Sequence, residues 1–163
     1  MCSSDLPHEM HAGLTAEAAS AHCELALGQA REFEALKNQT LEVGECLEIH
    51  RLKTAPAFRV ALFAAAIAAG RFAELRALFH AFSDKLGAAY QLYDDLEDEG
   101  ANPASAVDVL MRSNGWGRET ARTETARMYQ LERDGIYELL ERVGDVPLKI
   151  FLYRLAGKVL KDV

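Results

Sequence analysis

The side chains of this protein that are best suited to chemistry are acids near the middle of the sequence. Between Asp94 and Glu99, five of the six residues carry a carboxylate. We expect this segment to end a long helix, where each acid is disfavoured by roughly 0.3–1 kcal/mol because the carboxyl end carries partial negative charge. A cation would offset that repulsion, and clustered carboxylates are oxygen ligands that suit Mg²⁺. The segment therefore indicates a metal site, with a solvated acidic helix end as the alternative.

Helical spacing gathers part of this segment on one side. Each residue of an α-helix turns about 100°, so Gly87, Gln91, Asp94 and Asp98 share a face and Asp95 lies beside it. The candidate Mg²⁺ ligands are accordingly Asp94, Asp95 and Asp98. A magnesium ion held by one or two carboxylates keeps some of its water and bridges to substrate phosphates.

Two other segments carry weaker chemical signals. Lys53 and Thr54 stand just before Pro56 at a predicted helix boundary, where an ammonium group and a hydroxyl can hold a phosphate. Gly28 interrupts an otherwise apolar helix at a cost near 1 kcal/mol relative to alanine, which predicts the close approach of another helix. The alternatives are an exposed Lys-Thr pair and a glycine that serves packing alone.

The elements that must position these residues are helices. The chain has 163 residues, half of them hydrophobic and only 8% aromatic, and its many alanines favour helix over strand. We expect residues 1–14 to form a flexible tail and residues 15–163 to form one all-α domain without strands. The predicted helices cover residues 16–37, 41–53, 54–69, 72–99, 103–112 and 118–143, and a last helix starts at Pro147.

One predicted helix is apolar on all sides. Residues 58–69 offer no polar face, and such a helix is normally central. We therefore expect this stretch to be nearly fully buried.

Charge and hydropathy exclude several classes of protein. The net charge is -7, which disfavours nucleic acid and anionic membranes because both bind through Lys and Arg. The longest apolar run, from Val60 to Gly70, has 11 residues, whereas a transmembrane helix needs about 20. The three cysteines, Cys2, Cys23 and Cys46, form no CxxC pair. We expect reduced thiols, no signal peptide and a cytoplasmic location.

The order of the three chemical segments resembles the trans-polyprenyl diphosphate synthases, the family of the farnesyl and geranylgeranyl diphosphate synthases. The resemblance covers about residues 15–160 and concerns the C-terminal half of that family. The matching motifs are Gly28-Gln29-x-x-Glu32 for GQxxD, Lys53-Thr54 for the KT pair, Tyr90-Gln91 for Phe-Gln, and Asp94-Asp95-Leu96-Glu97-Asp98 for the second DDxxD motif.

The resemblance implies a partial helical bundle of the isoprenoid synthase type. It also implies Mg²⁺-assisted ionisation of an allylic diphosphate, whose cation then alkylates isopentenyl diphosphate. The metal ligands would be Asp94, Asp95 and Asp98, of which the first two would be catalytic together with Lys53. The substrate-binding residues implied are Lys53, Thr54, Gln91 and Gln29.

Two departures from the family pattern suggest half of an enzyme. Nothing similar to the first aspartate-rich motif precedes Gly28, and no lysine occurs between Lys85 and Lys149, where the family has a Gly-Lys pair. We expect the chain alone to be inactive, and to form a homo-oligomer or a complex with a chain that carries the other half. The alternatives are a non-catalytic regulatory subunit, or a fragment of a head-to-head synthase of the squalene or phytoene type, because the acidic segment also reads as DxxED.

Overall fold

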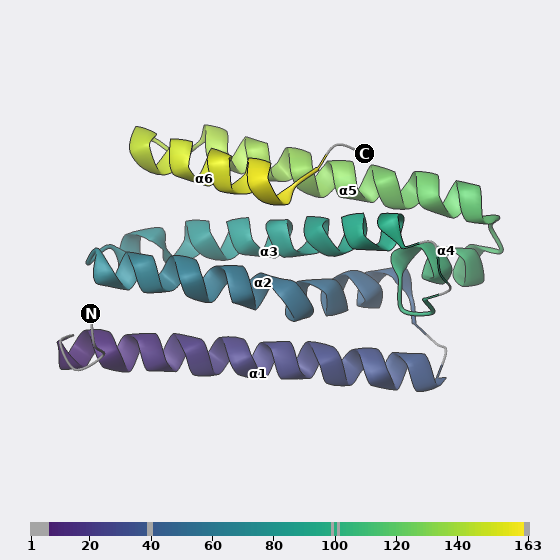
Figure 1. Cartoon of the computed structure of the whole chain (residues 1–163), viewed down its shortest axis with the longest axis horizontal. Coiled ribbons are helices and arrows are strands. Elements are labelled where there is room, and N and C mark those ends of the chain that lie inside the picture. Colours follow the sequence, from purple (N-terminus) through teal and green to yellow (C-terminus); the bar gives the residue numbers. More distant parts are fainter. Residues whose placement is uncertain (1–6, 39–40, 99, 101, 162–163) are drawn as a thin grey trace.

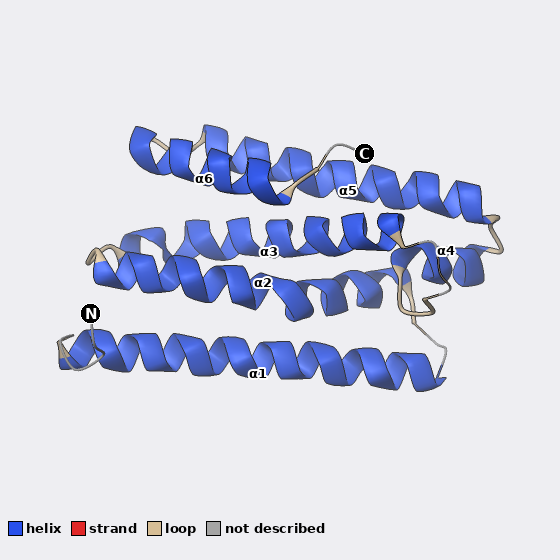
Figure 2. Cartoon of the chain, in the orientation of Figure 1, coloured by secondary structure: helices blue, strands red, loops and turns tan. Residues whose placement is uncertain are grey.

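The computed structural model describes residues 7–38, 41–98, 100 and 102–161 (Figure 1). Within these ranges the chain forms six helices and no strand (Figure 2). The helices are α1 (His8–Asn38), α2 (Val43–Ala68), α3 (Phe72–Glu97), α4 (Ala106–Asn114), α5 (Arg118–Glu141) and α6 (Val146–Val159). The all-α prediction is confirmed. None of the described helices is both long enough and apolar enough to cross a bilayer.

The long helices lie in three layers (Figure 1). α1 forms one outer layer, α2 and α3 the middle layer, and α5 with α6 the other outer layer. α2 packs against both α1 and α3, α3 packs against α5, and the short α4 contacts the ends of several of them. The main hydrophobic core lies around α3, where Phe82, Leu86 and Leu92 are completely buried. The middle layer carries the Lys53-Thr54 pair and the acidic segment, and the outer helix α1 carries Gly28 and Gln29.

Local signals explain where several helices begin and end. Gly70, with a φ of +68°, separates α2 from α3, a conformation that glycine adopts without steric cost. Ser105 and Asp145 accept hydrogen bonds from the backbone of the first turns of α4 and α6, and Pro147 stands in the first turn of α6. The predicted boundaries at residues 69 and 147 agree with the structure to within one residue, whereas α4 begins three residues after its predicted start.

Two other predicted boundaries also differ from the structure. α2 runs without interruption through Thr54 and encloses Pro56, although a proline removes one helical hydrogen bond. The tertiary contacts of α2 on two sides outweigh that loss. α1 begins at His8, eight residues before the predicted start, so residues 8–14 of the expected tail are helical.

The prediction that residues 58–69 are nearly fully buried is wrong. Leu62, Phe63 and Ala66 are buried, but Ala61 and Ala65 are exposed. The reason is geometric: α1 and α3 cover two sides of α2, and no described element covers the third side. The chain therefore leaves an alanine-lined face of α2 open to solvent.

This arrangement makes opposite predictions for two adjacent alanines. Ala66 is only 2% exposed, so Ala66→Asp would bury an unpaired carboxylate and should destabilise the fold by about 3 kcal/mol. For a chain of this size that is a loss of roughly 6–12 °C in melting temperature. Ala65→Asp, on the open side, is the matched control and should melt close to the parent protein. Equal losses in both variants would contradict this packing of α2.

Candidate functional site

Two glycines let α1 and α3 approach α2 at the same point. A Cβ on Gly28 of α1 would lie 2.8 Å from Leu52 Cβ and 3.0 Å from the Lys53 backbone nitrogen. A Cβ on Gly87 of α3 would lie 2.5 Å from the backbone nitrogen of Ala55. Real side chains do not pack this closely, so only glycine fits at either position. The Lys53-Thr54 segment is therefore clamped between the two neighbouring helices.

The clamp brings the three sequence motifs together. Lys53 Nζ lies 2.5 Å from Glu32 Oε1 of α1, and the Gln29 side chain donates to the other oxygen of Glu32 at 2.8 Å. On the opposite side, Gln91 Nε2 of α3 donates to Thr54 Oγ1 at 2.9 Å. The structure thus places two sets of polar contacts on adjacent residues of α2, one from Lys53 to Glu32 and Gln29 of α1 and one from Thr54 to Gln91 of α3.

The acidic segment continues from this group to the end of α3. Asp94 and Asp98 are both exposed, and Asp98 Oδ1 accepts a hydrogen bond from Gly100 N at 3.0 Å. Among the described residues no salt bridge joins Asp94 or Asp98 to a basic side chain. Their charges lie at the negative end of the helix, which is the situation in which a cation is favourable.

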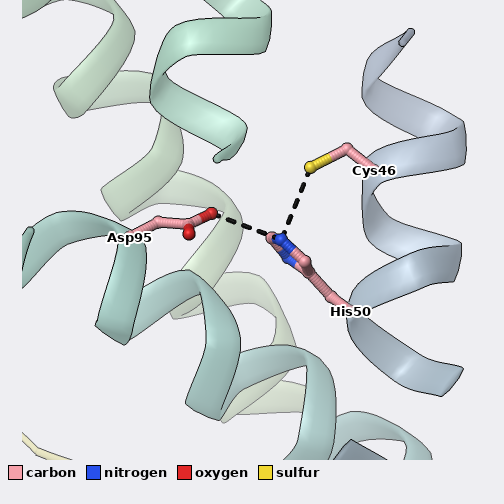
Figure 3. A group of neighbouring side chains, drawn as sticks. All are labelled: Cys46, His50 and Asp95. Carbon is pink, nitrogen blue, oxygen red and sulfur yellow. Dashed lines mark hydrogen bonds and ion pairs between the residues drawn. The ribbon is translucent and has the colours of Figure 1, made fainter. Parts of the chain in front are cut away.

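Asp95 lies in a different environment from its two neighbours (Figure 3). Its side chain is 7% exposed, and Oδ2 accepts from the backbone nitrogen of Ala106, the first residue of α4, at 2.7 Å. The same oxygen lies 3.4 Å from His50 Nε2 of α2. The position of Asp95 as an Mg²⁺ ligand beside Asp94 and Asp98 stays a prediction, since its carboxylate is directed into the protein.

Cys46 completes this buried cluster. Its sulfur lies 3.5 Å from His50 Nε2 and 3.4 Å from the carbonyl oxygen of Ala104, and Cys46 and His50 are one turn apart on α2 (Figure 3). Sequence reasoning did not single out either residue. The spacing of a cysteine and a histidine four positions apart on a predicted helix was the signal that could have found them.

Burial disfavours charge throughout the cluster. It lowers the pKa of His50 to about 3, with Lys53 adding to the effect, and it raises the pKa of Asp95 to about 7 despite the hydrogen bond from Ala106. The pKa of the Cys46 thiol is raised by burial and by the nearby Asp95 carboxylate. His50 is therefore neutral at pH 7, and the 3.4 Å approach of its Nε2 to Asp95 Oδ2 is not a pair of opposite charges.

Comparison with known proteins gives this helical architecture its class. Residues 4–107 match the family model described as polyprenyl synthetase. That match includes all three motifs and covers more than half of the chain, so the protein belongs to the polyprenyl synthetase family. No curated protein matches the chain in sequence.

Solved structures of prenyltransferases share the fold. A geranyltranstransferase from Methanosarcina mazei is 21% identical over 90% of this chain, with a TM-score of 0.74. A polyprenyl synthetase from Streptomyces coelicolor A3(2) is 18% identical over 93%, with a TM-score of 0.76. A geranylgeranyl pyrophosphate synthetase from Pyrococcus horikoshii Ot3 is 18% identical over 98%, with a TM-score of 0.77. The matches cover 52%, 60% and 61% of those three chains, so this chain spans little more than half of their length.

The clamp on α2 predicts how strongly each glycine matters. Gly87→Ala places a methyl group against the backbone of α2 and should cost about 1–3 kcal/mol through overpacking, measured by urea unfolding. Gly28→Ala should behave similarly. Gly157→Ala in α6 meets nothing within 4 Å and is the control, because a helical alanine there should stabilise by up to about 1 kcal/mol. Equal stabilisation by all three would rule out the clamp.

Proposed function

We propose that this chain provides the allylic-diphosphate and Mg²⁺-binding half of a trans-prenyltransferase that condenses allylic diphosphates with isopentenyl diphosphate. The observation that carries the proposal is that the adjacent Lys53 and Thr54 contact Glu32 of α1 and Gln91 of α3, and that Gln91 lies one turn before the acidic end of α3. A cation site and an anion site on adjacent helices are what a metal-bound diphosphate requires.

The residues present fit Mg²⁺, since Asp94 and Asp98 offer exposed oxygen ligands one helical turn apart. When bound, Mg²⁺ supplies Lewis acidity that stabilises the negative charge of the leaving diphosphate. The proposed magnesium site rests on these two acids, with Asp95 as a third ligand only if its side chain turns outward from the position in the structure.

The polar group at the clamp supports a role in holding diphosphate oxygens. Because Thr54 Oγ1 accepts its hydrogen bond from Gln91, its own proton is available to donate to a phosphate oxygen. Lys53 carries the positive charge that such a ligand needs, and Glu32 holds that ammonium in place at 2.5 Å. A diphosphate would compete with the Glu32 carboxylate for Lys53.

An exposed stripe along α1 supports the proposal of a second chain or second copy. Its positions alternate in spacing between four and three residues, the spacing of a helix–helix seam. The stripe consists of Ala12, Ala16, Ala19, Cys23, Ala26, Ala30 and Phe33, all exposed. Phe33, at the end of the stripe, is 65% exposed. A contiguous exposed apolar surface of this kind marks a site of association with another chain. Sedimentation that shows only monomers at high concentration would remove this part of the proposal.

A regulatory subunit without catalysis is the second candidate. The specific observation in its favour is the inward carboxylate of Asp95, which leaves two acids of the DDxxD segment at the surface. The two candidates differ in metal binding. The prenyltransferase half requires a competent Mg²⁺ site at Asp94 and Asp98, whereas the regulatory subunit does not.

The proposed site predicts a thermal shift that depends on metal and diphosphate together. A ligand at 100 times its Kd adds about 2.7 kcal/mol, or roughly 5–10 °C for a chain of this size. Asp94→Asn combined with Asp98→Asn should abolish the shift, while the metal-free variant melts at or slightly above the parent temperature because like charges are removed. Differential scanning fluorimetry with Mg²⁺ and inorganic diphosphate measures both effects.

The matched control is another exposed acidic pair with the same spacing. Asp134→Asn combined with Glu138→Gln removes two exposed acids four residues apart on α5 and should leave the shift intact. A flat melting temperature in the parent protein, from no Mg²⁺ to millimolar Mg²⁺ with diphosphate, would contradict a competent site in this chain and favour the regulatory candidate.

A further inference from the structure

Cys46 and His50 have no part in the proposed diphosphate site, and Asp95, the third member of the same buried cluster, has its carboxylate directed into the protein. The three side chains come from two helices and are 0%, 3% and 7% exposed, and a metal-ligating atom of each lies within 4.8 Å of the other two (Figure 3). We propose that Cys46, His50 and Asp95 bind a structural Zn²⁺ ion, separate from magnesium, with the carbonyl oxygen of Ala104 as a fourth ligand.

Three of the six separations among the four donor atoms match those of a tetrahedral zinc site. With zinc bonds of about 2.3 Å to sulfur and about 2.0–2.2 Å to nitrogen and oxygen, neighbouring ligand atoms lie roughly 3.3–3.6 Å apart. The structure has 3.5 Å from Cys46 Sγ to His50 Nε2, 3.4 Å from His50 Nε2 to Asp95 Oδ2, and 3.4 Å from Cys46 Sγ to Ala104 O. All three separations fall in that range without any movement of the backbone.

The chemistry of the donors selects zinc over magnesium. A thiolate and an imidazole are ligands for zinc and similar borderline metals, whereas Mg²⁺ takes oxygen ligands and keeps its water. The two anionic ligands, Cys46 and Asp95, balance the charge of the ion, so the loaded site is neutral and suits an interior position. Binding releases the Cys46 proton to solvent, and Asp95 can keep the hydrogen bond from Ala106 because a carboxylate has several acceptor positions.

The ion would tie the end of α3 to α2 and to the segment before α4. Cys46 and His50 lie on α2, Asp95 lies on α3, and Ala104 lies in the connection between α3 and α4. That connection directly follows the acids proposed to bind magnesium, so zinc would hold the acidic end in place.

One feature of the cluster bears on its affinity. His50 Nδ1 has no hydrogen-bond partner among the described residues, whereas zinc-binding histidines usually donate this second N–H to a carbonyl or carboxylate. The lack of such a partner typically lowers metal affinity about 10–100-fold. The site is therefore expected to be weaker than a four-ligand cysteine and histidine site and to lose zinc to a strong chelator.

Metal analysis of the full chain tests the proposal. The protein is expressed in minimal medium with added Zn²⁺ or Co²⁺, desalted, and measured by inductively coupled plasma mass spectrometry and by absorption. We expect close to one zinc per chain, and in the cobalt protein a thiolate-to-cobalt charge-transfer band with the visible bands of tetrahedral cobalt. Removal of zinc by a chelator should lower the melting temperature. Inorganic diphosphate is left out, so the result is independent of the magnesium site.

Two cysteine variants make the test specific. Cys46→Ser should lose the charge-transfer band and most of the zinc, whereas Cys23→Ser, at an exposed cysteine of α1, should keep both. Should Cys46→Ser fail to fold, His50→Gln gives the same readout at a second ligand. Absence of zinc and of the cobalt bands in the folded parent protein, or their survival in Cys46→Ser, would overturn the proposal.

Discussion

The structure depends on one steric constraint, the close approach of three helices around residues 52–55 of α2. Gly28 and Gly87 both face this short stretch, and neither position has room for a Cβ. Glycine in the middle of a helix costs up to about 1 kcal/mol relative to alanine, and here that cost is offset by backbone-to-backbone packing. Lys53 and Thr54 lie at this contact. The close approach of the helices therefore also sets the distances from these two side chains to Glu32 and Gln91.

Buried charge reinforces the same arrangement along α2. Arg59 is 6% exposed and contacts Glu24 of α1 and Asp84 of α3. A buried guanidinium group is destabilising unless it is paired with an acid. Because the two acids come from α1 and α3, Arg59 is paired only when both helices pack against α2 as they do here. Arg59 lies one to two turns from Lys53, and the two basic residues hold α1 through different acids.

The sequence predicted the helices better than it predicted burial. Helical periodicity and caps placed α3 to α6 within a few residues, and Gly28 indicated the close approach of another helix that the structure has. The helix boundary predicted near Pro56 was wrong because tertiary packing on two sides kept α2 helical. The burial predicted for Ala65 was wrong because burial depends on which other elements cover a helix face.

The interior of the site was also beyond sequence reasoning. A charged side chain is normally expected at the surface. Asp95 is nevertheless buried, and its burial is tolerated because Ala106 and His50 supply polar contacts. Those partners come from α4 and α2, and their distance to Asp95 follows from how the chain turns after α3. Cys46 lies four residues before His50 on the same helix, but the carbonyl oxygen of Ala104 and the Asp95 carboxylate reach this pair only in the folded chain.

The most direct test of the diphosphate site is isothermal titration calorimetry of inorganic diphosphate into the chain, with and without Mg²⁺. We expect Mg²⁺-dependent binding that is lost in Lys53→Met and kept in Lys158→Met, a change at an exposed lysine of α6. Loss of one charge-assisted contact corresponds to about 1.5–3 kcal/mol, or roughly 10–200-fold in Kd. Binding that needs no Mg²⁺, or that is equally strong in Lys53→Met, would contradict the claim that the clamped segment and the acidic helix end form one site.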